Sequence, residues 1–365
     1  MFTDSGTQSI KKINIVDDPR IRRCSSTING KTYGYLLAEP EGGFTRTVFL
    51  IHGFPDLSSA WRNQIPLFLK FGFRVVCPDC IGYGRSVSYI CPGGIEMGTK
   101  MRTKDAPTGS IIPYTFKSHA DDFVQLAKQL NCENIIVGGH DWGAVIAYRC
   151  ALYYPDFITH LFTFVIPYIA PSFKWVETDV LVNRFPSLGY QLQFGSDDGV
   201  IESFTREKAG IRAFLNALYG GTSPAGKYAM DVTKGVDLEL APKLQHTRLV
   251  SPEELDFYVE EFARNGLPCN YYRNRKQNFE DELVFKDKPD AAFITCPTLF
   301  IRSVDDAIVT SVMVASMGTM VPNLTLKDVK AGHWILWQKP VEVNDILTGW
   351  MRQQGLVAED TFGHL

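Results

Sequence analysis

The 365-residue chain lacks the long apolar run that a membrane-spanning helix needs. Crossing the hydrocarbon core takes about 20 predominantly apolar residues, and no unbroken run of this chain approaches that length. It also lacks an excess of charge of one sign, because 37 basic and 40 acidic residues give a formal net charge of −3. No strong electrostatic field therefore favours a nucleic acid. We expect neither a membrane span nor a nucleic-acid partner.

The N-terminal residues lack the basic patch and following apolar stretch that are typical of a secretory signal. The eight cysteines are scattered along the chain. Only Cys77 and Cys80 have a spacing typical of metal or redox sites, and no second Cys or His pair lies at a suitable distance. We expect reduced thiols, a cytoplasmic location, and neither a metal nor another cofactor.

Hydrophobic residues make up 45% of the chain and aromatic residues 12%, which is enough for a substantial core. The most informative segment is Gly138-Gly139-His140-Asp141-Trp142-Gly143. A β-branched run at 134–137 precedes it and predicts a buried strand, and helical apolar spacing follows over 144–152. A Gly-x-Asp-x-Gly turn between a strand and a helix indicates a nucleophile elbow with Asp141 at its tip. A carboxylate there attacks saturated carbon and forms an alkyl ester.

An elbow of this kind needs donors for a developing oxyanion. The predicted strand 47–51 runs into His52-Gly53-Phe54-Pro55. We expect the backbone N–H groups of Phe54 and Trp142 to form the oxyanion hole. The Phe54–Pro55 bond is a candidate cis peptide, because a sharp turn is required there.

An acid and a base should follow the nucleophile in that order along the chain. The predicted strand 297–303 ends before Asp305 and Asp306, and one of these carboxylates should orient the catalytic imidazole. The strand 324–329 leads to Gly332-His333-Trp334, where a histidine beside a glycine suits a general base. The residues alone leave Asp305 and Asp306 open.

Together these motifs, with Pro78-Asp79 and Gly82-Tyr83-Gly84-Arg85-Ser86, resemble the epoxide hydrolases of the α/β-hydrolase superfamily. The resemblance extends from about residue 30 onward. The family members that the chain resembles are of the soluble type without an N-terminal phosphatase domain. It implies an α/β fold with a mostly parallel central sheet, helices on both faces and an inserted helical cap. We expect the core at 1–166 and 290–365 and the cap at 167–289. Helical patterns within that insertion agree, such as 251–262, which opens with Ser, Pro and two acids.

The resemblance also implies site residues. Two lid tyrosines donate to the epoxide oxygen in this family, and the matching contexts are Tyr190-Gln191-Leu192-Gln193-Phe194 and Asn270-Tyr271-Tyr272-Arg273-Asn274. The second tyrosine falls on Tyr272, although Tyr271 beside it stays open, and the family strand places the acid at Asp306. Further substrate-binding residues are expected at His52, Gly53, Pro55, Gln191, Phe194 and Trp334.

The implied reaction has two steps. Asp141 attacks an epoxide carbon while Tyr190 and Tyr272 donate to the oxygen, and water activated by His333 then hydrolyses the ester to a vicinal diol. The partners are thus a small-molecule epoxide and water. Some aromatic residues at the start of the cap should line an apolar pocket for a lipophilic substrate; the candidates are Phe164, Tyr168, Phe173, Trp175 and Phe185.

Several questions stay open. A haloalkane or haloacid dehalogenase shares the fold and the aspartate–histidine chemistry, but it binds halide through indole or amide N–H groups. A non-catalytic binding member would keep the pocket and lose the chemistry. The chain could be a monomer or a homodimer. Its role could be detoxification, degradation of an environmental compound or a step in secondary metabolism, and the polar excursion over 87–113 has no assigned part.

Overall fold

The computed structural model describes residues 11–87 and 110–358, so most of the 87–113 excursion lies outside the described residues. Within these ranges the largest sheet has eight strands in the order β1-β2-β4-β3-β5-β6-β9-β10. Strands β1 and β2 pair antiparallel, as do β2 and β4, and the remaining neighbours are parallel. The strands are β1 (Arg22–Ile28), β2 (Lys31–Ala38), β3 (Arg46–Ile51), β4 (Phe73–Pro78), β5 (Ile135–His140), β6 (Ile158–Phe164), β9 (Thr298–Ser303) and β10 (Leu324–Val329). The predicted α/β-hydrolase fold is confirmed.

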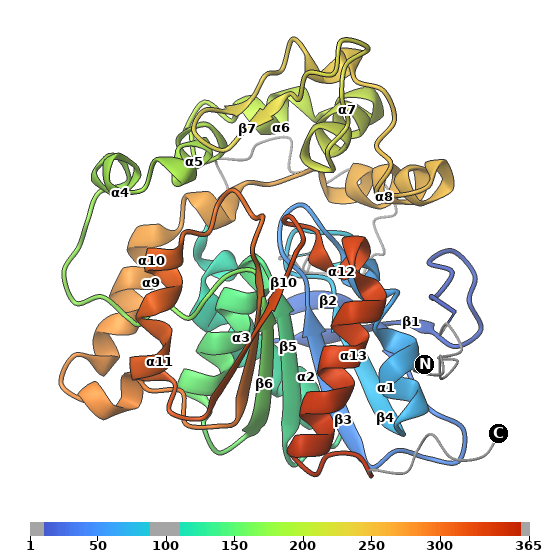
Figure 1. The fold of residues 1–365 in the computed structure, drawn as a ribbon, viewed down its shortest axis with the longest axis vertical. Helices are drawn as coiled ribbons and strands as arrows, with labels where there is room; N and C mark the ends of the chain where they lie inside the picture. The colour runs from blue at the N-terminus through green and yellow to red at the C-terminus, as the bar shows by residue number, and fades with distance from the viewer. Residues whose placement is uncertain (1–10, 88–109, 359–365) are drawn as a thin grey trace, which may run out of the picture.

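Helices cover both faces of this sheet, which is why the residues of the inner strands β4 and β5 are buried along the whole length of each strand. On one face, Phe68 of α1 (Ile65–Lys70) stacks on Phe162 of β6 with ring centroids 5.6 Å apart. Trp350 of α13 (Pro340–Gln353) contacts the same phenylalanine at 6.4 Å. On the other face lies α3 (Trp142–Tyr153), which packs beside α2 (Phe116–Gln129) and follows β5 directly (Figure 1).

A layer of short helices lies above the carboxyl ends of the parallel strands (Figure 1). It includes the hairpin β7–β8 and the longer helices α7 and α8. The bounds are α4 (Thr178–Arg184), α5 (Tyr190–Phe194), α6 (Val200–Phe204), α7 (Lys208–Leu218), β7 (Met230–Asp231), β8 (Gly235–Val236) and α8 (Pro252–Asn265). Helix α8 begins with a capping box between Ser251 and Glu254 and has Pro252 at its first position, as the sequence predicts.

Helix α8 is anchored to the core by buried polar contacts. Arg62 pairs with Glu254 at 2.9 Å, and the Tyr258 hydroxyl donates to Asp56 at 2.8 Å. The Asn265 amide donates to two backbone carbonyls of the loop after β4. Because these groups are withdrawn from water, breaking one leaves a partner unsatisfied, which holds this end of the cap in place.

The predicted cap boundary at residue 289 stays a prediction. Helix α9 (Arg275–Glu282) lies inside the predicted cap range but packs against core helices, since Glu282 pairs with Arg149 of α3 at 2.7 Å. The remaining helices are α10 (Ser311–Ala315), α11 (Met317–Met320) and α12 (Ile335–Gln338). Among the described residues, no helix is long and apolar enough to cross a bilayer.

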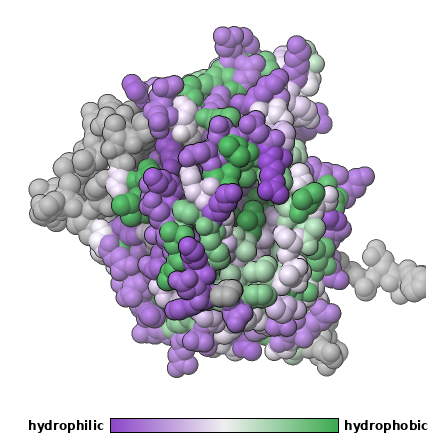
Figure 2. Space-filling model, turned by 90° about the vertical axis from the view of Figure 1, so that its left-hand side faces the viewer, coloured by the Kyte–Doolittle hydropathy of each residue, from purple (hydrophilic) through white to green (hydrophobic). Residues whose placement is uncertain are grey.

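One face of the molecule carries apolar side chains between the cap and the core, within an otherwise hydrophilic surface (Figure 2). Elements on this side of the molecule include α4, α9 and α10 (Figure 1). Exposed apolar residues in these elements and in α5 are Val180, Leu192 and Val312.

Candidate active site

The elbow forms where β5 ends and α3 begins. Asp141 has φ 54° and ψ −126°, a conformation that a residue with a side chain rarely adopts. The turn is closely packed, because a Cβ atom on Gly143 would lie 2.1 Å from the carbonyl oxygen of Ile51. One on Gly139 would lie 2.2 Å from the carbonyl oxygen of Gly143. These glycines allow the sharp turn that raises the Asp141 carboxylate above the edge of the sheet.

The predicted oxyanion donors surround that carboxylate. The Phe54 N–H donates to Asp141 Oδ1 at 2.8 Å, and the Trp142 N–H also bonds the carboxylate. The Phe54–Pro55 peptide is cis, as predicted. Burial raises the pKa of Asp141, while the charge of His333 and the two N–H groups oppose that shift.

His333 lies between two carboxylates. Its Nδ1–H donates to Asp306 Oδ2 at 2.8 Å, and its Nε2 lies 3.6 Å from Asp141 Oδ2. Asp305 is exposed and makes no ion pair with this imidazole among the described residues. The geometry therefore places Asp306, and not its neighbour, behind the histidine.

The electrostatics of the Asp306–His333 pair favour the charged form of both side chains. Burial favours the neutral form of Asp306, but the hydrogen bond and charge of His333 and two backbone N–H groups outweigh it, so its pKa lies below the usual range. Burial also favours neutral His333, but the hydrogen bond and charge of Asp306 outweigh it and raise its pKa. Asp306 is thus suited to stabilise the imidazolium that forms when His333 accepts a proton.

His140 supports this arrangement from the elbow. Burial lowers its pKa to about 3, so the ring is neutral near pH 7. Its Nε2–H donates to the carbonyl oxygen of His333 at 2.8 Å. This contact gives His140 a positioning role for the loop that carries the base.

Two tyrosines face the nucleophile from the cap. Tyr190 of α5 and Tyr272 of the 3-10 turn at Asn270–Tyr272 have ring centroids 5.8 Å apart and line one cavity with Asp141 and His333. Burial, with Asp141 nearby, raises the pKa of both phenols, which stay protonated and can donate. Tyr271 points elsewhere: its ring stacks on Tyr83 and Trp142, and its hydroxyl lies 3.3 Å from His119 Nε2.

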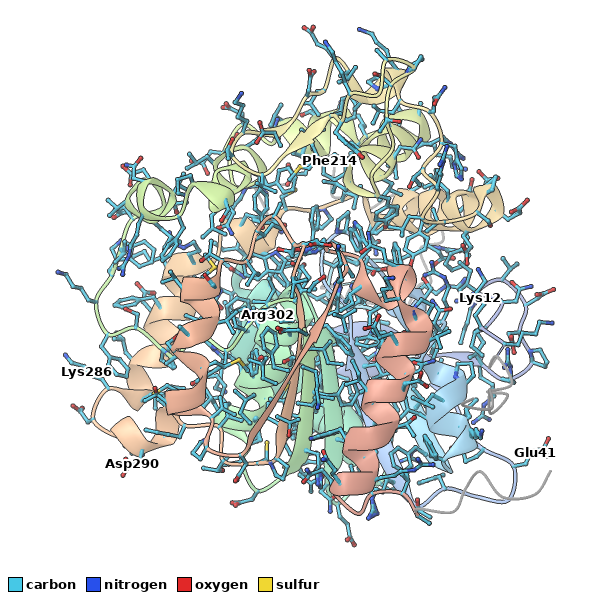
Figure 3. The ribbon with its side chains drawn as sticks, viewed as in Figure 1. Lys12, Glu41, Phe214, Lys286, Asp290 and Arg302 are labelled. Atoms are coloured by element: carbon cyan, nitrogen blue, oxygen red, sulfur yellow. The ribbon has the colours of Figure 1, made fainter. Side chains whose placement is uncertain are left out.

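The cavity has a volume of about 1000 Å³. Its wall includes Pro55, Phe194 and Trp334, three of the six predicted substrate-binding residues. Phe54 holds that wall together, since its ring lies 5.8 Å from that of Phe194 and 6.2 Å from that of Phe214. Phe214 lies in the cap, above the ends of the strands (Figure 3).

The other three predicted substrate-binding residues do not line this cavity, and their role stays a prediction. His52 is fully buried, and its Nε2 accepts the Cys80 N–H at 2.8 Å, so it braces the loop. Gly53 passes under Asp141, where a Cβ atom would lie 2.4 Å from Oδ1. Gln191 is buried beside Tyr190, and its side chain makes a hydrogen bond with that phenol.

The expectation that aromatic residues at the start of the cap line the pocket is wrong for this cavity. Phe164 and Tyr168 belong to the buried core, and Trp175 packs on Phe279 with ring centroids 5.6 Å apart. The wall instead takes residues that no sequence motif marks, because they come from separate segments of the cap; examples are Leu218, Tyr219, Met230, Val232 and Arg248. Within 11–87 and 110–358, no three His, Cys, Asp or Glu side chains gather as metal ligands.

This sheet and nucleophile elbow define an α/β-hydrolase, and residues 46–198 match the family described as alpha/beta hydrolase fold. Epoxide hydrolase srdG of Neurospora crassa is 34% identical to the chain, over 92% of this chain and 97% of the relative. The chain belongs to the epoxide hydrolase family. Bifunctional epoxide hydrolase 2 of Sus scrofa is 28% identical, and its match takes in 96% of this chain but 61% of the pig protein.

Solved structures agree with that membership. The crystal structure of epoxide hydrolase A from Mycobacterium thermoresistibile has a TM-score of 0.72 and 26% identity. The alignment covers 91% of this chain and 98% of the mycobacterial chain. The likeness thus includes the cap as well as the sheet.

Proposed function

We propose that the protein hydrolyses a lipophilic epoxide to a vicinal diol through a covalent ester on Asp141. One observation carries the proposal: a single cavity joins the Asp141 carboxylate, the phenols of Tyr190 and Tyr272, and the His333 imidazole. A carboxylate supplies the nucleophile, two phenols supply protons, and an imidazole supplies the base. Each of these groups, which the two-step reaction requires, therefore lies in the same cavity.

In the first step Asp141 attacks an epoxide carbon. Its Oδ1 accepts the Phe54 N–H, which leaves Oδ2 free to form the new C–O bond. The epoxide C–O bond breaks, and its electron pair moves to the oxygen, which takes a proton from Tyr190 or Tyr272. Since burial keeps these phenols protonated, both are ready to donate as charge develops.

In the second step water hydrolyses the ester. His333 removes a proton from the water, Asp306 stabilises the imidazolium, and the new hydroxide bonds to the carbonyl carbon of Asp141. The resulting oxyanion receives the N–H groups of Phe54 and Trp142. The ester bond to the substrate then breaks, and the diol oxygen takes a proton from His333. The carboxylic acid left on Asp141 loses its proton, and the tyrosinate formed in the first step regains one, so the carboxylate and the phenol are both restored.

A His333→Gln variant tests this route by intact mass spectrometry. It should still form the ester but hydrolyse it slowly, so an aryl epoxide should add its whole mass, and peptide mapping should place it on Asp141. Asp141→Asn is the matched control and should gain no mass, because it lacks the nucleophile.

The same experiment separates the alternatives. An alkyl halide that adds its mass minus the halogen, with no adduct from the epoxide, would reassign the protein as a dehalogenase. A folded variant that binds an epoxide but forms no adduct would indicate a binding protein.

A further inference from the structure

One buried hydrogen-bond donor behind the cavity lacks a full partner. The indole Nε1–H of Trp142 is buried, and it makes no hydrogen bond of ordinary geometry with any described residue. Buried polar groups are nearly always paired, because an unpaired group loses its hydration without compensation. An indole N–H can only donate. The Trp142 N–H is therefore available to an acceptor that becomes stronger during the reaction.

The indole ring is held in one orientation. It stacks on the rings of Phe116 and Tyr271, with a centroid distance of 5.8 Å in each case. The ring of Tyr272 meets it edge to face, with centroids 5.4 Å apart and an angle of 83° between the planes. These contacts fix the direction of the N–H before a substrate binds, so no reorganisation is required when charge develops beside it.

The group that this N–H faces is the Tyr272 phenol, which lines the cavity with Asp141. Burial raises the pKa of Tyr272, and a hydrogen bond from the Trp142 side chain opposes that rise. The Tyr272 hydroxyl in turn donates to Tyr190, as the Gln191 side chain also does. Donors therefore follow one another from the indole through Tyr272 to Tyr190.

The strength of the indole contact depends on the charge of the phenol. In the resting site Tyr272 is neutral, and its oxygen is a weak acceptor. When the epoxide C–O bond breaks, the proton of a phenol moves to the epoxide oxygen, and its electron pair stays on the phenolic oxygen. A hydrogen bond to an ionised group is roughly twice as strong as one between neutral groups. The contact thus strengthens as ring opening proceeds, and only such interactions lower the barrier.

We propose that the indole N–H of Trp142 stabilises the tyrosinate that ring opening leaves on Tyr272. This inference rests on the proposed function and adds a positioning residue to it, since Trp142 acts through Tyr272 and does not line the cavity. Trp142 then has two separate roles. Its backbone N–H serves the oxyanion of ester hydrolysis, and its side chain serves the acid of ester formation.

Two changes at Trp142 test the side chain by rapid-quench single-turnover kinetics. Trp142→Phe removes the N–H, and benzothienylalanine at this position keeps the two-ring plane with sulfur in place of the N–H. Both should slow ester formation by about tenfold, the lower end for a hydrogen bond to a charged group. Epoxide affinity and ester hydrolysis should stay unchanged. Trp175→Phe is the matched control, because its Nε1–H donates to Glu177 at 2.7 Å away from the cavity.

A titration without substrate tests the contact directly. Tyr272 is replaced by a difluorinated tyrosine, which ionises at lower pH than tyrosine, and the absorbance of its phenolate is followed against pH. Adding Trp142→Phe to this protein should raise the phenol pKa, since the phenolate loses a donor. The same pair of proteins with the difluorinated tyrosine at Tyr190 should show a smaller shift, because Tyr190 receives its hydrogen bonds from Tyr272 and Gln191.

The outcomes separate this inference from the function on which it rests. A phenol pKa at position 272 that Trp142→Phe leaves in place would overturn the role of the indole, and so would normal ester formation in both Trp142 variants. Ester hydrolysis slowed as much as ester formation would assign the effect to a displaced elbow backbone and would overturn it as well. No adduct in His333→Gln, beside a raised phenol pKa in the titration, would overturn the epoxide hydrolase function and the role in ring opening with it.

Discussion

Replacing Tyr272 by Phe tests the site most sharply, because the preceding residue, Tyr271, provides its control. The change removes one phenolic O–H and keeps the ring. That ring packs against those of Phe54 and Phe194, with centroids 5.4 Å and 5.2 Å away, so the cavity should keep its shape. The variant therefore loses a proton donor with little loss of packing.

The expected magnitude follows from the second tyrosine. Removing one donor to a developing oxyanion typically slows a reaction by about 10²–10³-fold. Tyr190 remains, with its ring 5.8 Å from that of Tyr272, and can still donate to the same oxygen. We therefore expect the lower end of that range, a loss of about 100-fold in the rate of ester formation. Ester hydrolysis should be nearly unchanged, since it depends on His333 and backbone N–H groups.

Single-turnover kinetics measure the two steps separately. Trp142 follows the nucleophile directly, so stopped-flow tryptophan fluorescence should report ester formation and decay. Tyr271→Phe is the control: it loses the contact with His119 at 3.3 Å, which should lower the free energy of unfolding by about 1 kcal/mol. Its rate of ester formation should match the wild type.

Two results would refute this reasoning. One is slow ester formation in Tyr271→Phe together with a normal rate in Tyr272→Phe, which would assign the proton donor to Tyr271. The other is a Tyr272→Phe variant that forms the ester normally and hydrolyses it slowly, which would remove the phenol from the ring-opening step.

Two further predictions concern the groups around Asp141. Gly53→Ala would place a Cβ atom 2.4 Å from Asp141 Oδ1, so the loop must move, and ester formation should slow by about 100-fold. Gly349→Ala is the control because no atom lies within 4 Å of its added Cβ, and equal rates for the two variants in a single-turnover assay would contradict the reasoning. For the pH dependence, Asp306 raises the pKa of His333 above the ordinary value of 6.5, and the base acts as the neutral imidazole. Ester hydrolysis should therefore slow as the pH falls through that raised pKa, and Asp306→Asn should move the midpoint to lower pH. A single-turnover pH profile checks this, and a midpoint that stays in place or rises in Asp306→Asn would count against it.

Several features of this protein follow from local sequence. The elbow at Asp141 needs a strand, two glycines and a helix within a short segment, and each has a distinct pattern of residues. The start of helix α8 also follows from local sequence, since the side chains of Ser251 and Glu254 each accept a hydrogen bond from the other's backbone N–H. The order of nucleophile, acid and histidine can likewise be read from the sequence. Each of the three follows a predicted strand, and these strands end at the same edge of the sheet.

Other features depend on how distant segments pack. Tyr271 and Tyr272 are neighbours of the same type in one irregular turn, and only packing directs one toward Trp142 and Tyr83 and the other into the cavity. For Asp305 and Asp306, the position of His333 on another strand's loop decides between them.

The cavity wall shows most clearly what local sequence does not predict. The sequence motif that contains His52 correctly predicts that the Phe54 N–H lies beside Asp141, but it does not show that the His52 imidazole is buried in the core. Arg248 lies in no motif at all and lines the cavity because hydrogen bonds from its neighbours to Thr222, Asn216 and Tyr219 hold its segment there. Local patterns thus determined which residues gather at the centre of the site. Which side chains surround a substrate was decided by tertiary packing, because contacts between segments far apart in sequence set the direction of each side chain.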